Sequence, residues 1–139
     1  MEKFSWKPHE KSMTLEKLAT HIADLPAWVS HALTKNELDF ASNYPHPPKI
    51  NSTEELITLL DKNSKTALAE IEKSSDAHFM ESWTLRNGEK IFFTMPRIAV
   101  VRGIAMNHIV HHRGQLSVYL RLLDVPLPAI YGPTADENI

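Results

Sequence analysis

The chain contains no cysteine among its 139 residues. That absence excludes disulfide bridges, a cysteine nucleophile and zinc sites built on thiolates. Any metal ion must therefore be held by histidine, by carboxylates or by backbone groups. For the same reason, any chemistry that uses a thiol requires a thiol supplied from outside the chain.

Long apolar runs and a strong charge imbalance are also absent. No segment approaches the roughly 20 apolar residues that span a bilayer, and the N-terminus lacks the apolar core of a signal peptide. We therefore expect no membrane partner and a cytoplasmic location. The net charge of −2 gives no electrostatic reason to expect a nucleic-acid partner. The composition, with 42% hydrophobic and 23% charged residues, predicts one globular domain over residues 1–139.

The apolar residues that are present recur with a helical period of about 3.6. They predict three long helices, at residues 15–35, 52–73 and 96–124. Thr14 and Ser52 are the expected N-caps of the first two, because their hydroxyl groups can accept from free backbone N–H groups. Pro26 is expected to kink the first helix. Pro96 fits the first position of the third helix.

The segments between these helices carry turn signals. Residues 36–51 are expected to be irregular, because the run Tyr44-Pro-His-Pro-Pro48 cannot be helical. Between the second and third helices, Asn87-Gly88 lies between apolar residues and predicts a β-hairpin with a type I′ turn. The expected fold is therefore mainly α, with a small β-hairpin before the last long helix.

His108 and His112 are the most informative pair of residues. They lie four residues apart on the third helix and therefore project from one face. At about 100° per residue, that face also carries Val101, Ala105 and Leu116. Burying two imidazoles is costly unless each finds a polar partner. A divalent metal ion inside a helix bundle would serve both, and the alternative is a pair of hydrogen-bonded core histidines.

The other histidines are less informative. His21 lies at the edge of the apolar stripe of the first helix, where a lone histidine is more often a hydrogen-bonded core residue than a ligand. We expect His31 to be solvated and His111 to be marginal or exposed. Ile109 stands where the zinc-protease motif carries its glutamate, which argues against that class. The sequence gives no reason to pair the histidines of the irregular segments, which are His9, His46 and His78.

Four stretches of the chain, spread over almost its whole length, resemble one protein family. They are Phe4-Ser-Trp-Lys-Pro-His-Glu-Lys-Ser-Met-Thr-Leu15, Leu18-Ala-Thr-His21, His108-Ile-Val-His-His-Arg-Gly-Gln115 and Ile130-Tyr-Gly-Pro-Thr-Ala-Asp-Glu137. The third stretch is the most specific. With these residues the chain resembles the DinB/YfiT-like proteins, which are damage-inducible or stress-associated bacterial proteins.

The resemblance implies a four-helix bundle that holds a divalent metal ion, commonly nickel or zinc, on three histidines. Carried to this chain, the ligands are His21, His108 and His112. Some relatives are thiol-dependent transferases or isomerases that use bacillithiol, mycothiol or glutathione. We therefore expect a metal-dependent transferase or hydrolase acting on a small molecule, with an external thiol as a possible cosubstrate. The alternative is a noncatalytic stress-inducible protein that binds a metal or ligand.

Two further residues are candidates for supporting the ligands or lining a pocket. Gln115 falls beside His108 on the third helix, one turn beyond His112, and Asp24 follows His21 by three residues. No residue in the sequence is singled out as a general acid or base.

The resemblance also predicts an oligomer. Family members carry a long helix ahead of the segment that matches Phe4, whereas three residues precede it in this sequence. Three long helices would leave one apolar face of the bundle open. Either the true start of the chain lies upstream, or a second subunit covers that face. We expect the chain to be a homodimer or to be poorly soluble.

Overall fold

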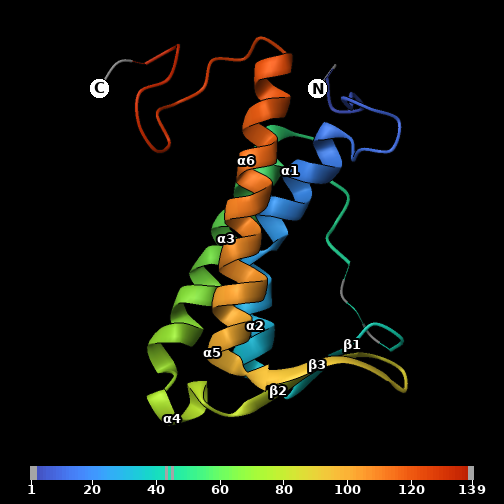
Figure 1. Ribbon diagram of the computed structural model, residues 1–139, viewed down its shortest axis with the longest axis vertical. Coiled ribbons are helices and arrows are strands. Elements are labelled where there is room, and N and C mark those ends of the chain that lie inside the picture. Colours follow the sequence, from blue (N-terminus) through green and yellow to red (C-terminus); the bar gives the residue numbers. More distant parts are fainter. Residues whose placement is uncertain (1–2, 43, 45, 138–139) are drawn as a thin grey trace.

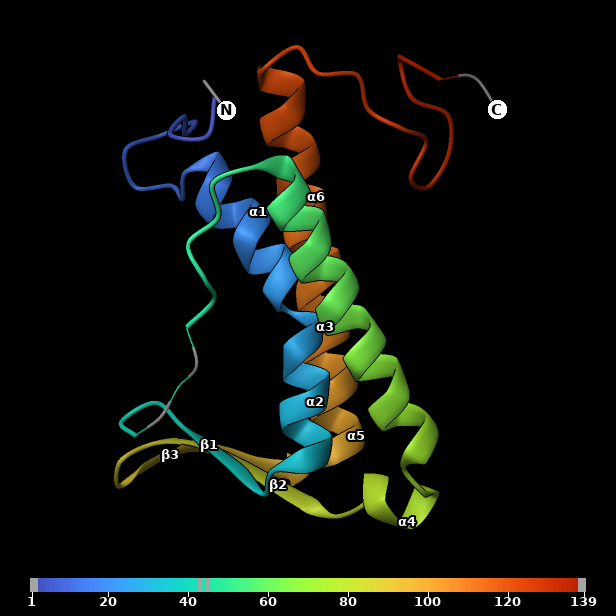
Figure 2. The ribbon, with the colours of Figure 1, turned by 180° about the vertical axis from the view of Figure 1, so that it is seen from behind.

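The computed structural model describes residues 3–42, 44 and 46–137. It is mainly helical, with long rods that run side by side and a small sheet at one end (Figure 1). The view from behind shows the first and the last of the described segments away from the sheet, at the opposite end of the bundle (Figure 2). None of the helices in the described part of the chain is long and apolar enough to cross a membrane.

The first predicted helix is divided into α1 (Leu15–Asp24) and α2 (Pro26–Thr34). Leu25 joins them with helical dihedral angles, and the chain bends where the two helices meet (Figure 1). The break falls at Pro26 because proline has no N–H to donate to the preceding turn. Thr14 is the predicted N-cap, and its hydroxyl oxygen accepts a hydrogen bond from the backbone N–H of Lys17 at 3.2 Å.

The second predicted helix is α3 (Thr53–Lys73), which packs against both α1 and α2. The hydroxyl oxygen of Ser52 accepts from the backbone N–H of Glu55 at 3.1 Å, as expected for an N-cap. The Glu55 carboxylate reaches back to accept from the backbone N–H of Asn51 at 2.7 Å. These bonds satisfy donors that the first turn of a helix leaves free.

The third predicted helix is continuous but changes its winding. It runs through α5 (Arg97–Ala99), the π-helical segment η1 (Val100–Met106) and α6 (Asn107–Leu122). A π-helical turn holds more residues than an α-helical one, so a uniform helical wheel does not apply across η1. Pro96 is the last residue of a strand rather than the first of the helix, which corrects the predicted start.

A three-stranded sheet closes one end of the bundle. The predicted hairpin is present as β2 (Ser82–Asn87) and β3 (Lys90–Pro96), which pair antiparallel after the short helix α4 (Asp76–Phe79). The irregular connector also contains β1 (Glu37–Asp39), which pairs parallel to β2. Alternating periodicity cannot reveal so short a strand. Tyr44, His46 and the residues to 51 are not helical, as expected, while Pro45 lies outside the described residues.

The predicted turn type of the hairpin is wrong. Asn87 pairs with Lys90 at the end of the strands, so the two central residues are Gly88 and Glu89. Gly88 has a φ of 59°, and Glu89 is not among the residues with positive φ. Positive φ at the first central residue alone is the pattern of a type II′ turn, whereas type I′ requires it at both.

The hydrophobic core lies between α2, α3, η1 and the sheet. It includes Leu25, Trp28, Val29, Ala32, Leu33, Leu38, Ala67, Trp83, Leu85, Val100, Val101 and Ala105. The indole of Trp83 is fully buried and donates to the backbone carbonyl of His31 at 3.3 Å. His31 itself is half-buried rather than solvated, and burial lowers the pKa of its imidazole. The wheel of a single helix missed this burial because it does not describe packing against distant parts of the chain, such as the contact of Trp83 with His31.

A buried arginine ties α2 to the third helix. The Arg97 guanidinium donates to the backbone carbonyls of Ala32 and Lys35 and to the Asn36 side-chain oxygen, and it pairs with Glu81 at 3.2 Å. The carbonyls at the C-terminal end of α2 would otherwise have no partner. Arg97 therefore fixes the position of the third helix relative to the first helical rod.

We expect Arg97→Met to lower the free energy of unfolding by about 1–3 kcal/mol, because it leaves the buried carbonyl of Ala32 without its partner and removes the other hydrogen bonds of the guanidinium. Urea unfolding followed by circular dichroism measures this. Arg102→Met, at an exposed position nearby, is the control and should change stability little. Equal effects of the two substitutions would contradict the structural role of Arg97.

Candidate metal centre

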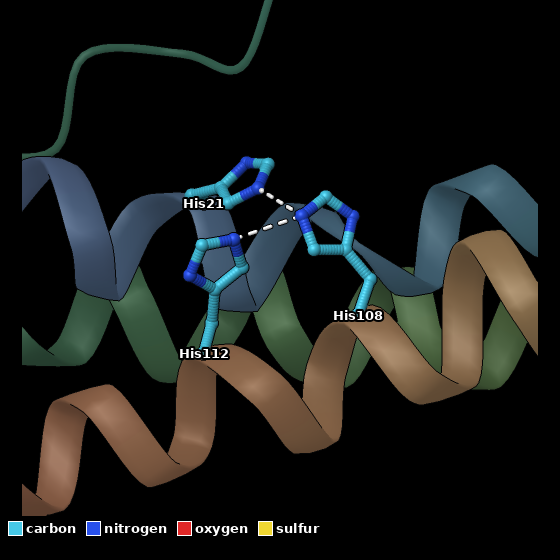
Figure 3. A group of neighbouring side chains, drawn as sticks. All are labelled: His21, His108 and His112. Carbon is cyan, nitrogen blue, oxygen red and sulfur yellow. Dashed lines mark hydrogen bonds between the residues drawn. The ribbon is translucent and has the colours of Figure 1, made fainter.

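The two helical rods bring three predicted residues together. His21 lies on the last turns of α1, and His108 and His112 lie on the first two turns of α6. The helices α1 and α6 pack against each other. Figure 3 shows the three imidazole rings pointing toward one another in the space between the helices. His111, next to His112, is exposed as expected.

The ring nitrogens of these histidines converge. The Nε2 atoms of His21 and His108 are 3.4 Å apart, and those of His112 and His108 are 2.8 Å apart. One ligand atom from each of the three residues lies within 4.8 Å of the others. Two unprotonated nitrogens this close repel each other through their lone pairs, unless a proton or a cation lies between them.

Burial lowers the pKa of two of these imidazoles, His21 and His108. The pKa of His21 is lowered from 6.5 to about 4, first by burial, then by His112 and His108, and least by Lys17. The pKa of His108 is also lowered by burial and by the charges of its histidine neighbours. Both rings are therefore neutral near pH 7, which is the form that binds metal ions.

Hydrogen bonds on the far side of the rings orient them. His112 Nδ1 lies 2.7 Å from the side-chain oxygen of Gln115, so it donates there and leaves Nε2 facing the cluster. His108 hydrogen bonds to the backbone of Ile104, which opposes the lowering of its pKa. Ile104 belongs to η1, so the π-helical segment lies directly beside the histidine cluster.

Asp24 is the last residue of α1, three residues after His21. It is half-buried, and burial raises the pKa of its carboxyl group while a side-chain hydrogen bond from Asn63 opposes the shift. No hydrogen bond joins it to His21 within the described ranges of the chain. Its predicted support of His21 stays a prediction.

Sequence reasoning missed one histidine near the cluster. His46 lines an open cavity of about 540 Å³ together with Met13, Lys17, His21 and Pro47. It lies in the irregular connector, where no periodicity relates it to the helices. Only the path of the folded chain places His46 on the same cavity as His21.

Comparison with known proteins identifies the family. The model of the DinB family matches residues 1–138. The chain belongs to the DinB family. A DinB-like protein, YjoA, from Bacillus subtilis has a similar crystal structure, with a TM-score of 0.65 and 19% sequence identity. The match covers 94% of this chain and 82% of that chain, and at this identity it shows the fold alone. No curated protein matches.

The donor atoms of this DinB family chain suit a divalent cation. Three imidazole nitrogens face one space, and the described part of the chain adds no fourth histidine or carboxylate to the group. Imidazole binds zinc, nickel, copper and iron, so the ligand type alone does not select the metal. Three protein ligands with a remaining open position are typical of catalytic rather than closed structural zinc sites.

We expect the metal-free protein to lose stability as the pH falls from about 6.5 to about 4. The lowered pKa of His21 means that the unfolded chain binds a proton in this range before the folded chain does. Urea unfolding at several pH values should show a shallower loss for His21→Gln. His9→Gln, at an exposed site, is the control, and an unchanged slope in His21→Gln would contradict the burial of a neutral His21.

Proposed function

We propose that this protein binds one divalent metal ion, nickel or zinc, through His21, His108 and His112. The convergence of three Nε2 atoms from two packed helices carries the proposal. The lowered pKa values of His21 and His108 support it, because neutral imidazoles need no proton release to bind a cation.

We further propose that the protein is a metal-dependent enzyme, a thiol-dependent transferase or a hydrolase acting on a small molecule. When bound, such an ion lowers the pKa of a coordinated water or thiol toward neutrality. Gln115 orients the His112 ring, and the cavity beside His21 gives a small molecule access to the cluster. Because the chain has no cysteine, a thiol-dependent reaction would use an external thiol.

A noncatalytic protein that binds a metal or ligand under stress is the second candidate. A structural site would be closed by a fourth protein ligand and shielded from solvent. Here His21 and His108 are only half-buried, and the cavity reaches His21. These features favour the enzyme.

We expect about one nickel or zinc ion per chain in the purified, untagged protein, and almost none in the double variant His108→Ala/His112→Ala. Mass spectrometry for metals measures the content directly. His111→Ala is the matched control, because His111 is exposed and lies between the two proposed ligands in sequence. It should keep its metal.

Two results would contradict the metal site. One is wild-type protein that binds no divalent ion even after titration with nickel and zinc. The other is a metal content that the double variant and His111→Ala reduce equally.

If the metal binds as proposed, thiol-transfer and hydrolase substrates should be screened with the metal-loaded protein. Inactivity with both classes of substrate would favour the noncatalytic candidate.

We also propose that the protein is a homodimer. Large apolar side chains are exposed along α3 and α6, and a small hollow between α1, α3 and α6 is lined mainly by apolar residues. The exposed residues are Ile57, Leu60, Leu68 and Ile71 on α3, Met106 at the end of η1, and Val110, Val118 and Leu122 on α6. A two-fold contact lets the same apolar surface cover itself on the second copy.

Light scattering should therefore give a dimer mass for the wild type. The double variant Leu68→Glu/Val110→Glu should be monomeric, because both side chains are more than half exposed on these helices and a buried charge opposes association. Ile91→Glu, at an exposed apolar position on the sheet, is the control and should stay dimeric. A stable, folded wild-type monomer would contradict the proposal.

A further inference from the structure

The cavity beside the histidine cluster is large enough for a small organic molecule. Its volume is about 540 Å³, within the range of about 300–1,000 Å³ that is common for ligand pockets. His21 forms part of its wall, so a molecule in the cavity contacts one of the proposed metal ligands. The remaining lining residues decide which kind of molecule fits.

The lining is partly apolar and partly cationic. Met13 and Pro47 present apolar atoms, while Lys17 and His46 present nitrogen donors. None of the lining residues in the described part of the chain is acidic. A molecule that matches this lining has an apolar part and a group that accepts hydrogen bonds from cationic or neutral N–H donors.

Lys17 places a positive charge close to His21. It precedes His21 by four residues on α1, so both side chains project from the same side of the helix. No ion pair with a carboxylate neutralises Lys17 within the described ranges. Its charge also contributes to the lowered pKa of His21. Lys17 is an exposed residue that lines the cavity, and it therefore brings there a positive charge that no carboxylate among the described residues neutralises.

A divalent ion on three neutral imidazoles would keep its full charge, and Lys17 adds to it. Two positive centres beside one cavity attract a ligand of opposite sign. One ammonium group and one imidazole N–H can each donate a hydrogen bond to one of the two oxygen atoms of a carboxylate.

We propose that the cavity binds a small organic molecule that carries a carboxylate, with Lys17 attracting the carboxylate and His46 donating a hydrogen bond to it. Met13 and Pro47 pack against the apolar part of the molecule. This inference rests on the proposed function for the reacting end of the ligand, which faces the histidine cluster. It names the substrate or cosubstrate class as a carboxylic acid.

Two thiols of nearly equal size test the proposal on zinc-loaded protein. 3-Mercaptopropionate carries a carboxylate, and 3-mercaptopropan-1-ol carries a hydroxyl group in its place. Isothermal titration calorimetry gives the Kd of each probe for the wild type and for Lys17→Met, which removes the charge and keeps the chain length. The two thiols also differ in how strongly each binds zinc by itself. Comparing the ratio of their Kd values between the wild type and Lys17→Met cancels that difference.

The ratio is the Kd of the alcohol divided by the Kd of the carboxylate. We expect it to be about three- to fivefold larger in the wild type than in Lys17→Met, as for a partly exposed charge pair. The difference should shrink as salt is added. His46→Ala should reduce the ratio in the same direction. Lys65→Met, at an exposed position on α3, is the control and should keep the wild-type ratio. Equal ratios in the wild type and Lys17→Met would overturn the proposal.

Zinc content, measured first on each protein, separates this inference from the metal site. If zinc binds and the ratios are equal, the carboxylate pocket is wrong and the metal site stands. If zinc does not bind, the metal-free protein is titrated with propionate and with propan-1-ol, and the methyl resonance of Met13 is followed by NMR. A shift caused by propionate that Lys17→Met removes supports the pocket, and the absence of such a shift overturns it.

Discussion

The convergence of three imidazole rings between α1 and α6 is the constraint on which the site depends. Helix packing places the Nε2 atoms of His21, His108 and His112 so close that each depends on the protonation or occupancy of its neighbours. Burial holds the pKa of His21 at about 4 and also lowers that of His108. Removing these imidazoles from water costs free energy in the folded protein. A bound cation would offset that cost.

The rest of the fold serves to hold these two helices in register. The break at Pro26 ends α1 one turn after His21, and Arg97 joins the end of α2 to the start of the third helix. The π-helical segment η1 then places Ile104 against the His108 ring. The two interruptions of regular α-helix, at Pro26 and in η1, therefore both lie between the sheet and the histidine cluster.

Helical periodicity was sufficient to predict the long helices and the shared face of His108 and His112. The capping residues Thr14 and Ser52 were also predictable, because their role depends on neighbours within one turn. The family resemblance, rather than the spacing, singled out His21, since a lone histidine at the edge of an apolar stripe is ambiguous.

Features that depend on distant parts of the chain could not be predicted. The strand β1 is three residues long and exists because β2 pairs with it. His31 is half-buried and His46 reaches the cavity because of packing that no helical wheel describes. The π-helical segment left the predicted core positions Val101 and Ala105 buried, although it changed the phase of the wheel.

The most direct test of a three-histidine metal centre is X-ray absorption spectroscopy on the zinc- or nickel-loaded protein. We expect three imidazole nitrogens in the first coordination shell, at about 2.0–2.1 Å for zinc, with an exchangeable oxygen as any remaining ligand. His108→Ala should reduce the imidazole scattering or abolish metal binding. A first shell dominated by oxygen, with no imidazole scattering, would contradict the assignment of the metal to these histidines.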